Sequence, residues 1–295
     1  MSARQIAALG IDLRGRNRGQ VKTTCPECSH TRHKKLDPCL SVNIDEGVYH
    51  CHNCGWAGGT SGGKRDAYSA PPAPRAWTKP DHTPAETVPP SVLDYLAKRG
   101  ITREVAERNR VGSAVVAIGK DRGKRPTIAF PYFRDGQIVN VKYRTLDKQF
   151  RMVWGAELTL YGIDDIRPDQ PLIWCEGEPD KLALEVAGYR AAVSVPNGAP
   201  SPTAKNYTKH FEYLGTEAER IGAVKRHIIA VDADEPGHVL QGELIRRLGP
   251  EKCSLAEWPV GCKDANETLV KLGVEGVRAA IEQARSAPVV GLYDA

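Results

Sequence analysis

The chain has 295 residues, of which 41% are hydrophobic and 26% are charged, and its mean hydropathy is −0.42. This composition is typical of a globular protein of about two domains, and the net charge of +5 permits a polyanionic partner without requiring one. No apolar run approaches the roughly 18–20 residues of a membrane span, and the first 18 residues carry four arginines in place of a signal-peptide core. We therefore expect an intracellular, cytoplasmic protein with no membrane partner.

The N-terminal region carries two Cys-x2-Cys pairs, Cys25-Pro-Glu-Cys28 and Cys51-His-Asn-Cys54, separated by 22 residues. Structural zinc takes four tetrahedral ligands, and each pair supplies two thiolates from one tight turn. Residues 40–49 between the pairs read as two strands around a turn. The spacing predicts a zinc ribbon over residues 1–60, with one structural Zn²⁺ held by Cys25, Cys28, Cys51 and Cys54.

Three further potential ligands, Cys39, His50 and His52, lie in the same module, and we expect them to be ordinary ribbon residues. The ribbon either only folds the module or also contacts nucleic acid through the basic and aromatic residues around it. The sequence leaves this choice open, because a charged stretch is usually a solvated face.

Residues 61–90 contain seven of the 21 prolines, a composition that favours extended backbone and buries little apolar surface. We interpret them as a semi-rigid tether. Residues 91–170 then form a basic, β-rich subdomain, with helices predicted over 92–99 and 103–109 and strands over 113–118, 127–133 and 138–143. Residues 101–151 hold 12 Lys/Arg against 5 Asp/Glu, a local balance of +7.

Residues 171–286 alternate apolar strands with helices. Strands are predicted over 172–175, 191–195, 227–231 and 252–257, and helices over 179–187, 202–214, 236–248, 265–272 and 275–285. Alternation of this kind indicates a Rossmann-like α/β domain whose parallel sheet is covered on both faces. The fold class is therefore a multidomain α+β and α/β protein, with residues 287–295 as a tail or the start of a linker.

Carboxylates follow three of these predicted strands: Glu176-Gly-Glu178-Pro-Asp180, Asp232-Ala-Asp234 and Asp264. The carboxyl ends of parallel strands meet at one edge of a sheet, so these side chains are expected to lie close together. Like charges at that distance raise one another's pKa unless a cation lies between them, and hard oxygen ligands suit Mg²⁺ or Mn²⁺. The alternative is that they cap the following helices. Three successive strand ends favour the metal site.

The motifs EGEPD, VDADEPG and CKDANE resemble the TOPRIM fold of primases, topoisomerases and some nucleases, and are most similar to phage-type primases of primase–helicase proteins. The segments KYRTLDKQFRM and LTLYGIDDI resemble the RNA polymerase core of those primases, and the ribbon resembles their template-reading domain. The sequence holds no Walker A loop, so we expect the helicase half to be absent from this chain.

The resemblance implies a DNA primase that makes short RNA primers on single-stranded DNA from NTPs, by metal-dependent nucleotidyl transfer. It implies that Glu176, Asp232, Asp234 and Asp264 bind the Mg²⁺ or Mn²⁺, that Glu176 is also a general acid/base, and that Lys142, Arg144 and Lys148 contact the triphosphate. It further implies a replicative helicase, in cis or in trans, and a DNA polymerase as partners. The expected location is the bacterial cytoplasm, whether the protein is cellular or phage-encoded.

Two other classes of protein combine such elements. A non-enzymatic recombination mediator also joins a four-cysteine zinc element to a TOPRIM fold, but the long basic β-region has no evident role there. A TOPRIM metal-dependent nuclease is the second alternative. A topoisomerase is disfavoured, because the chain lacks room for a large tyrosine-bearing DNA gate.

Overall fold

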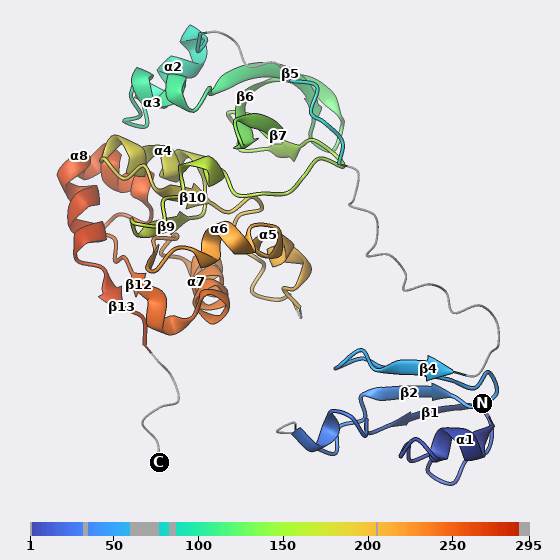
Figure 1. The fold of residues 1–295 in the computed structure, drawn as a ribbon. Coiled ribbons are helices and arrows are strands. Elements are labelled where there is room, and N and C mark those ends of the chain that lie inside the picture. Colours follow the sequence, from blue (N-terminus) through green and yellow to red (C-terminus); the bar gives the residue numbers. More distant parts are fainter. Residues whose placement is uncertain (1, 32–34, 60–76, 83–86, 205, 289–295) are drawn as a thin grey trace. The chain divides into compact units, whose positions relative to one another are not determined.

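The computed structural model describes residues 2–31, 35–59, 77–82, 87–204 and 206–288. The chain divides into two compact units, residues 1–75 and 76–295, which are described separately (Figure 1). Among the described residues, no helix has both the length and the apolar character needed to cross a membrane.

The first unit is a four-stranded antiparallel sheet in the order β1-β2-β3-β4. Its strands are β1 (Gln20–Thr23), β2 (Leu40–Asn43), β3 (Val48–Cys51) and β4 (Ala57–Gly59), with α1 (Ala3–Ala7) and a 3-10 turn, η1 (Ser29–Thr31). The predicted pair of strands is β2 and β3, and β1 and β4 extend the sheet on either side. Buried Ile6, Leu40 and Val42 belong to the core, which also contains Cys25, Cys28 and Cys51.

The second unit begins with a β-rich layer. Helices α2 (Pro90–Ala97) and α3 (Arg103–Arg108) precede an antiparallel sheet of β5 (Gly112–Ile118), β6 (Gly123–Arg134), β7 (Gln137–Arg144) and β8 (Phe150–Met152), in that order. The three strands predicted here correspond to β5, β6 and β7, whereas β8 was not anticipated. Its three residues are too few for an alternating pattern to stand out.

Part of the segment interpreted as a tether belongs to this second unit. The backbone N–H of Thr78 donates to the carbonyl of Gly155 over 2.8 Å, and the Val88 side chain is buried in the core with Val92 and Leu96. Residues 61–76 and 83–86 of the predicted tether lie outside the described residues.

A five-stranded sheet follows, in the order β10-β9-β11-β12-β13. Its strands are β9 (Leu172–Cys175), β10 (Ala192–Ser194), β11 (His227–Ile229), β12 (Cys253–Leu255) and β13 (Arg285–Ser286). The first four run parallel, as expected, and the edge strand β13 pairs antiparallel with β12.

Helices cover both faces of this sheet: α4 (Glu178–Val186), α5 (Glu212–Thr216), α6 (Ala218–Gly222), α7 (Glu235–Leu248) and α8 (Ala265–Glu282). Alternate residues of β9 point to opposite faces. Trp174 packs in one core with Leu240 of α7, while Ile173 packs in a second core with Leu184 of α4 and with α8. The predicted α/β arrangement with two covered faces is confirmed.

Two helix predictions were wrong in detail. The expected helix over 202–214 is replaced by a 3-10 turn, η3 (Lys209–Phe211), and by the short α5 and α6. Before them, the Asn206 side chain accepts a hydrogen bond from the Thr208 backbone N–H over 2.7 Å, a local contact that competes with helix formation. The helices expected over 265–272 and 275–285 form one element, α8, kinked at Gly273 where φ is 70°. Arg285 lies in β13 and not in a helix.

Candidate active site and metal centres

The four cysteines predicted to bind zinc converge in the first unit. Their sulfur atoms all lie within 4.8 Å of one another. The Cys25–Cys54 and Cys28–Cys51 Sγ separations are 3.8 Å and 3.7 Å. A tetrahedron with Zn–S bonds of about 2.3 Å has edges of about 3.8 Å, so these positions suit a zinc ion. The Asn53 backbone N–H and side-chain amide donate to Cys51 and Cys28 Sγ over 3.4 Å each, which stabilises thiolates.

The three spare potential ligands lie outside this four-thiol cluster. The sulfur of Cys39 is 4.0 Å from Cys28 Sγ, but its other contact is the Ser29 hydroxyl at 3.6 Å. The Nε2 atom of His52 is hydrogen-bonded to the Ser41 hydroxyl at 2.9 Å, and the His50 ring packs edge-on against it. This arrangement agrees with their interpretation as ribbon residues.

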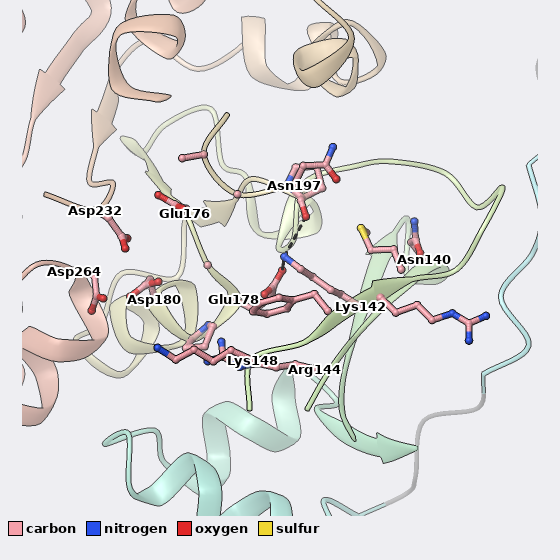
Figure 2. Close-up of a pocket in the computed structure, with 18 of the residues that line it drawn as sticks. Asn140, Lys142, Arg144, Lys148, Glu176, Glu178, Asp180, Asn197, Asp232 and Asp264 are labelled. Carbon is pink, nitrogen blue, oxygen red and sulfur yellow. Dashed lines mark hydrogen bonds and ion pairs between the residues drawn. The ribbon is translucent and has the colours of Figure 1, made fainter. Parts of the chain in front are cut away.

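The remaining predicted site residues line a single cavity of about 1190 Å³ in the second unit. In Figure 2 the carboxylates of Glu176, Asp232 and Asp264 lie together, and the basic side chains extend into the same cavity from the β-rich layer. The residues that sequence reasoning singled out, and that the structure brings together here, are Glu176, Asp232, Asp234, Asp264, Lys142, Arg144 and Lys148.

The carboxylates come from three strand–helix junctions. Glu176 directly follows β9, Asp232 and Asp234 lie between β11 and α7, and Asp264 precedes α8. Asp234 Oδ1 accepts from the Gly237 backbone N–H over 3.0 Å and Asp264 Oδ1 accepts from the Glu267 N–H over 2.6 Å, so both also cap helices. The capping alternative and the metal site are therefore compatible, because each cap uses one carboxylate oxygen and leaves the other.

Asp180 is a further member of the cluster that the sequence interpretation did not assign. It is buried at the start of α4, where its Oδ1 accepts from the Asn266 backbone N–H over 3.0 Å. The signal was present, since the EGEPD motif places Asp180 one helical turn beyond Glu176. We call Glu176, Asp180, Asp232, Asp234 and Asp264 the carboxylate cluster.

Burial and mutual repulsion perturb this cluster. Burial, followed by the charge of Asp232, raises the pKa of Glu176 to about 7. Burial also raises the pKa of Asp232, and burial together with Asp264 and Asp232 raises that of Asp180 well above its usual range. Glu176 Oε2 is buried without a hydrogen-bond partner among the described residues. An oxygen-only donor set with an unsatisfied carboxylate oxygen fits a hard divalent cation.

Lys142, Arg144 and Lys148 form the basic wall of the cavity, and two of them make contacts within the protein. The Lys142 ammonium is buried and donates to Glu178 Oε1 over 2.8 Å and to the Pro196 carbonyl over 3.1 Å (Figure 2). The Arg144 guanidinium lies over the Phe150 ring, 5.2 Å from its centroid. Lys148 is exposed in the turn between β7 and β8. Lys148 is therefore the most accessible of the three predicted triphosphate contacts.

Comparisons with known proteins agree with this architecture. Residues 171–256 match the family model described as "Toprim domain". The crystal structure of the primase fragment of the bacteriophage T7 primase-helicase protein superposes with a TM-score of 0.53 at 20% sequence identity, covering 88% of this chain and 98% of that one. The chain contains a Toprim domain and has the fold of the phage-type primase fragment. Along the chain, the four-cysteine sheet and the basic layer both precede the Toprim domain.

Two curated proteins of Arabidopsis thaliana are similar in sequence to this chain. The "Twinkle homolog protein, chloroplastic/mitochondrial" is 34% identical over 98% of this chain and 42% of its own length. The "Primase homolog protein" is 38% identical over 67% of this chain and 60% of its own length. The chain thus spans less than two thirds of the length of either relative.

Proposed function

We propose that this chain is a DNA primase, a DNA-directed RNA polymerase that synthesises short RNA primers on a single-stranded DNA template from NTPs. The observation that carries the proposal is the cavity in which the carboxylate cluster faces Lys142, Arg144 and Lys148. A nucleoside triphosphate needs both a cation site for its phosphates and positive side chains to orient it. The names of the curated relatives and the phage-type primase fold support the same reaction class.

Glu176, Asp232, Asp234 and Asp264 would hold Mg²⁺ or Mn²⁺, which neutralises charge on the triphosphate when bound. The chain's own groups orient the reactants around it. Lys148 and Arg144 contact the triphosphate, and the buried Lys142–Glu178 pair holds β7 against α4, which fixes the basic wall relative to the cluster. Glu176 accepts the proton of the attacking hydroxyl as the hydroxyl joins the α-phosphate of the next nucleotide and pyrophosphate leaves.

The zinc ribbon selects the template in this proposal. As a replication enzyme the protein would act with a replicative helicase and a DNA polymerase, in the compartment that holds the DNA, which we take to be the bacterial cytoplasm. These partners follow from the reaction, because a primer is useful only to a polymerase and single-stranded template is supplied by a helicase.

The test is synthesis from labelled NTPs on circular single-stranded DNA of mixed sequence with Mg²⁺. We expect short, alkali-labile products that require the DNA, and none from the Asp232→Asn/Asp234→Asn double variant. Absence of RNA from a wild-type protein that binds the DNA would contradict the proposal and favour a non-enzymatic DNA-binding role. Shortening of the DNA itself would identify a nuclease.

A further inference from the structure

Two aromatic side chains on the cavity wall are not buried. Trp154 is 89% exposed and Phe150 is 50% exposed, and both line the cavity that holds the carboxylate cluster. In the β7–β8 pair, Phe150 lies opposite Arg144 and Met152 lies opposite Lys142. Residues directly opposite one another share a face of the sheet, so Phe150 projects on the same side as the basic wall.

Positive groups surround the Phe150 ring. Its centroid is 5.5 Å from the Lys142 ammonium and 5.2 Å from the Arg144 guanidinium carbon. Exposed Lys148 lies in the turn immediately before β8. A solvated basic strand needs no aromatic residues, whereas grooves that bind single-stranded nucleic acid combine cations for the backbone with rings on which bases stack.

The backbone that presents Trp154 is held in place. The Gly155 carbonyl accepts the hydrogen bond from Thr78, and the Ala156 N–H donates to the Val153 carbonyl over 3.2 Å. Gly155 has φ of 74°, a left-handed conformation that disfavours other residues and turns the chain sharply after the indole. The exposed ring is therefore presented from a fixed turn.

We propose that Trp154 and Phe150 form a stacking platform for unpaired bases of single-stranded DNA, beside the basic residues of the cavity. The platform adjoins the carboxylate cluster in the same cavity, which would hold a template base beside the site of nucleotide joining. The choice of single-stranded DNA as occupant rests on the proposed function.

Equilibrium binding of a fluorescent oligothymidylate to the full chain, without divalent cations, tests the platform. Trp154→Ala and Phe150→Ala should each weaken binding by about fivefold or more, while Trp154→Phe retains most of the affinity. On an oligomer of the same length with abasic sites, wild type should bind more weakly and Trp154→Ala should lose nothing further. The salt dependence should be unchanged in Trp154→Ala, since stacking releases no counterions.

Val115→Ala is the matched control, because Val115 of β5 is 67% exposed and does not line the cavity. It should bind DNA as wild type does. If Trp154→Ala binds the intact oligomer with wild-type affinity, the platform is wrong. The same conclusion follows if Trp154→Ala loses ATP binding while its DNA binding is unchanged. If Trp154→Ala binds DNA normally while the wild type makes primers, only the platform is wrong. If stacking is observed but no RNA is made, only the primase activity is wrong.

Discussion

The Lys263 ammonium lies 2.9 Å from Asp232 Oδ2 and also 3.6 Å from Asp264 Oδ2. A protein cation thus lies among the oxygens proposed to bind a divalent ion. The hydrogen bond with Asp232 is the largest cause that raises the pKa of Lys263 above its usual range. Lys263 stabilises a group of carboxylates that would otherwise repel one another, and it competes with an added metal ion for the same oxygens.

Lys263→Met should therefore tighten the binding of Mn²⁺ to the carboxylate cluster. Removing one partly exposed positive charge at this distance is worth about 1 kcal/mol, or roughly fivefold in affinity. Titration of the full-length protein with Mn²⁺, followed by electron paramagnetic resonance, measures this. Lys225→Met is the control, since Lys225 is exposed and does not line the cavity. Unchanged or weaker Mn²⁺ binding would show that the ammonium does not compete with the ion.

Asp232→Asn or Asp234→Asn should lower primer synthesis by about 10²–10³-fold, the usual cost of losing a preorganised electrostatic contact. Folding and zinc content should be unchanged, because asparagine at position 234 still caps α7. Higher Mn²⁺ should partly restore activity, whereas Glu176→Gln should be inactive without rescue if its main role is proton transfer. Labelled-NTP incorporation measures this, with the exposed Asp169→Asn as control. Substantial Mg²⁺-dependent synthesis by the double variant would disprove the site.

The raised pKa of Glu176, about 7 against a usual 4.5, predicts a pH-dependent stability. Between these values the folded protein keeps a proton that the unfolded chain has released. This contribution is therefore fully present below pH 4.5 and is lost as the pH rises through 7. Relative to Glu176→Gln, the wild type should become less stable from pH 5 to pH 8 in urea denaturation without divalent cations. Added Mg²⁺ should reduce this difference in pH dependence between the wild type and Glu176→Gln. Identical stability–pH profiles of the two proteins would contradict the prediction.

The first unit should contain about one Zn²⁺ per chain. Cys51→Ser should lose the metal, because Cys51 supplies one of the four converging sulfur atoms, 3.7 Å from Cys28 Sγ. Cys39→Ser should keep it and serves as the matched thiol control. Elemental analysis of the purified proteins distinguishes the two. Full zinc content in Cys51→Ser would return His50 and His52 to consideration as ligands.

Limited trypsin digestion should cut after Lys64, Arg65 or Arg75, in the part of the predicted tether that precedes the second unit. Mass spectrometry should find a resistant fragment that begins near Ala76, since Thr78 and Val88 pack on that unit. The fragment should keep metal-dependent nucleotide joining and lose template-sequence selection. Equal selectivity of the fragment and the full chain would rule out template reading by the ribbon.

Local patterns account for what could be predicted. The two cysteine pairs each lie within four residues, and Asp232 and Asp234 are separated by one, so their chemistry is visible without knowledge of the fold. The apolar strands and glycine stops likewise indicated a parallel sheet, whose topology brings strand ends together. The helix expected over 202–214 failed because the Asn206 side chain satisfies a backbone N–H locally. The periodicity of apolar residues in the sequence does not reveal such a hydrogen bond.

Local sequence patterns identify which groups are available: four thiolates at zinc spacing, carboxylates after three strands and a basic β-region before them. How these groups are used depends on the three-dimensional fold. Lys142 pairs with Glu178, 36 residues away, because β7 packs against the start of α4. Phe150 lies beside Arg144 because of the register of β8 on β7. Such contacts depend on how separate elements pack and pair, and therefore leave no signature in the local spacing of residues.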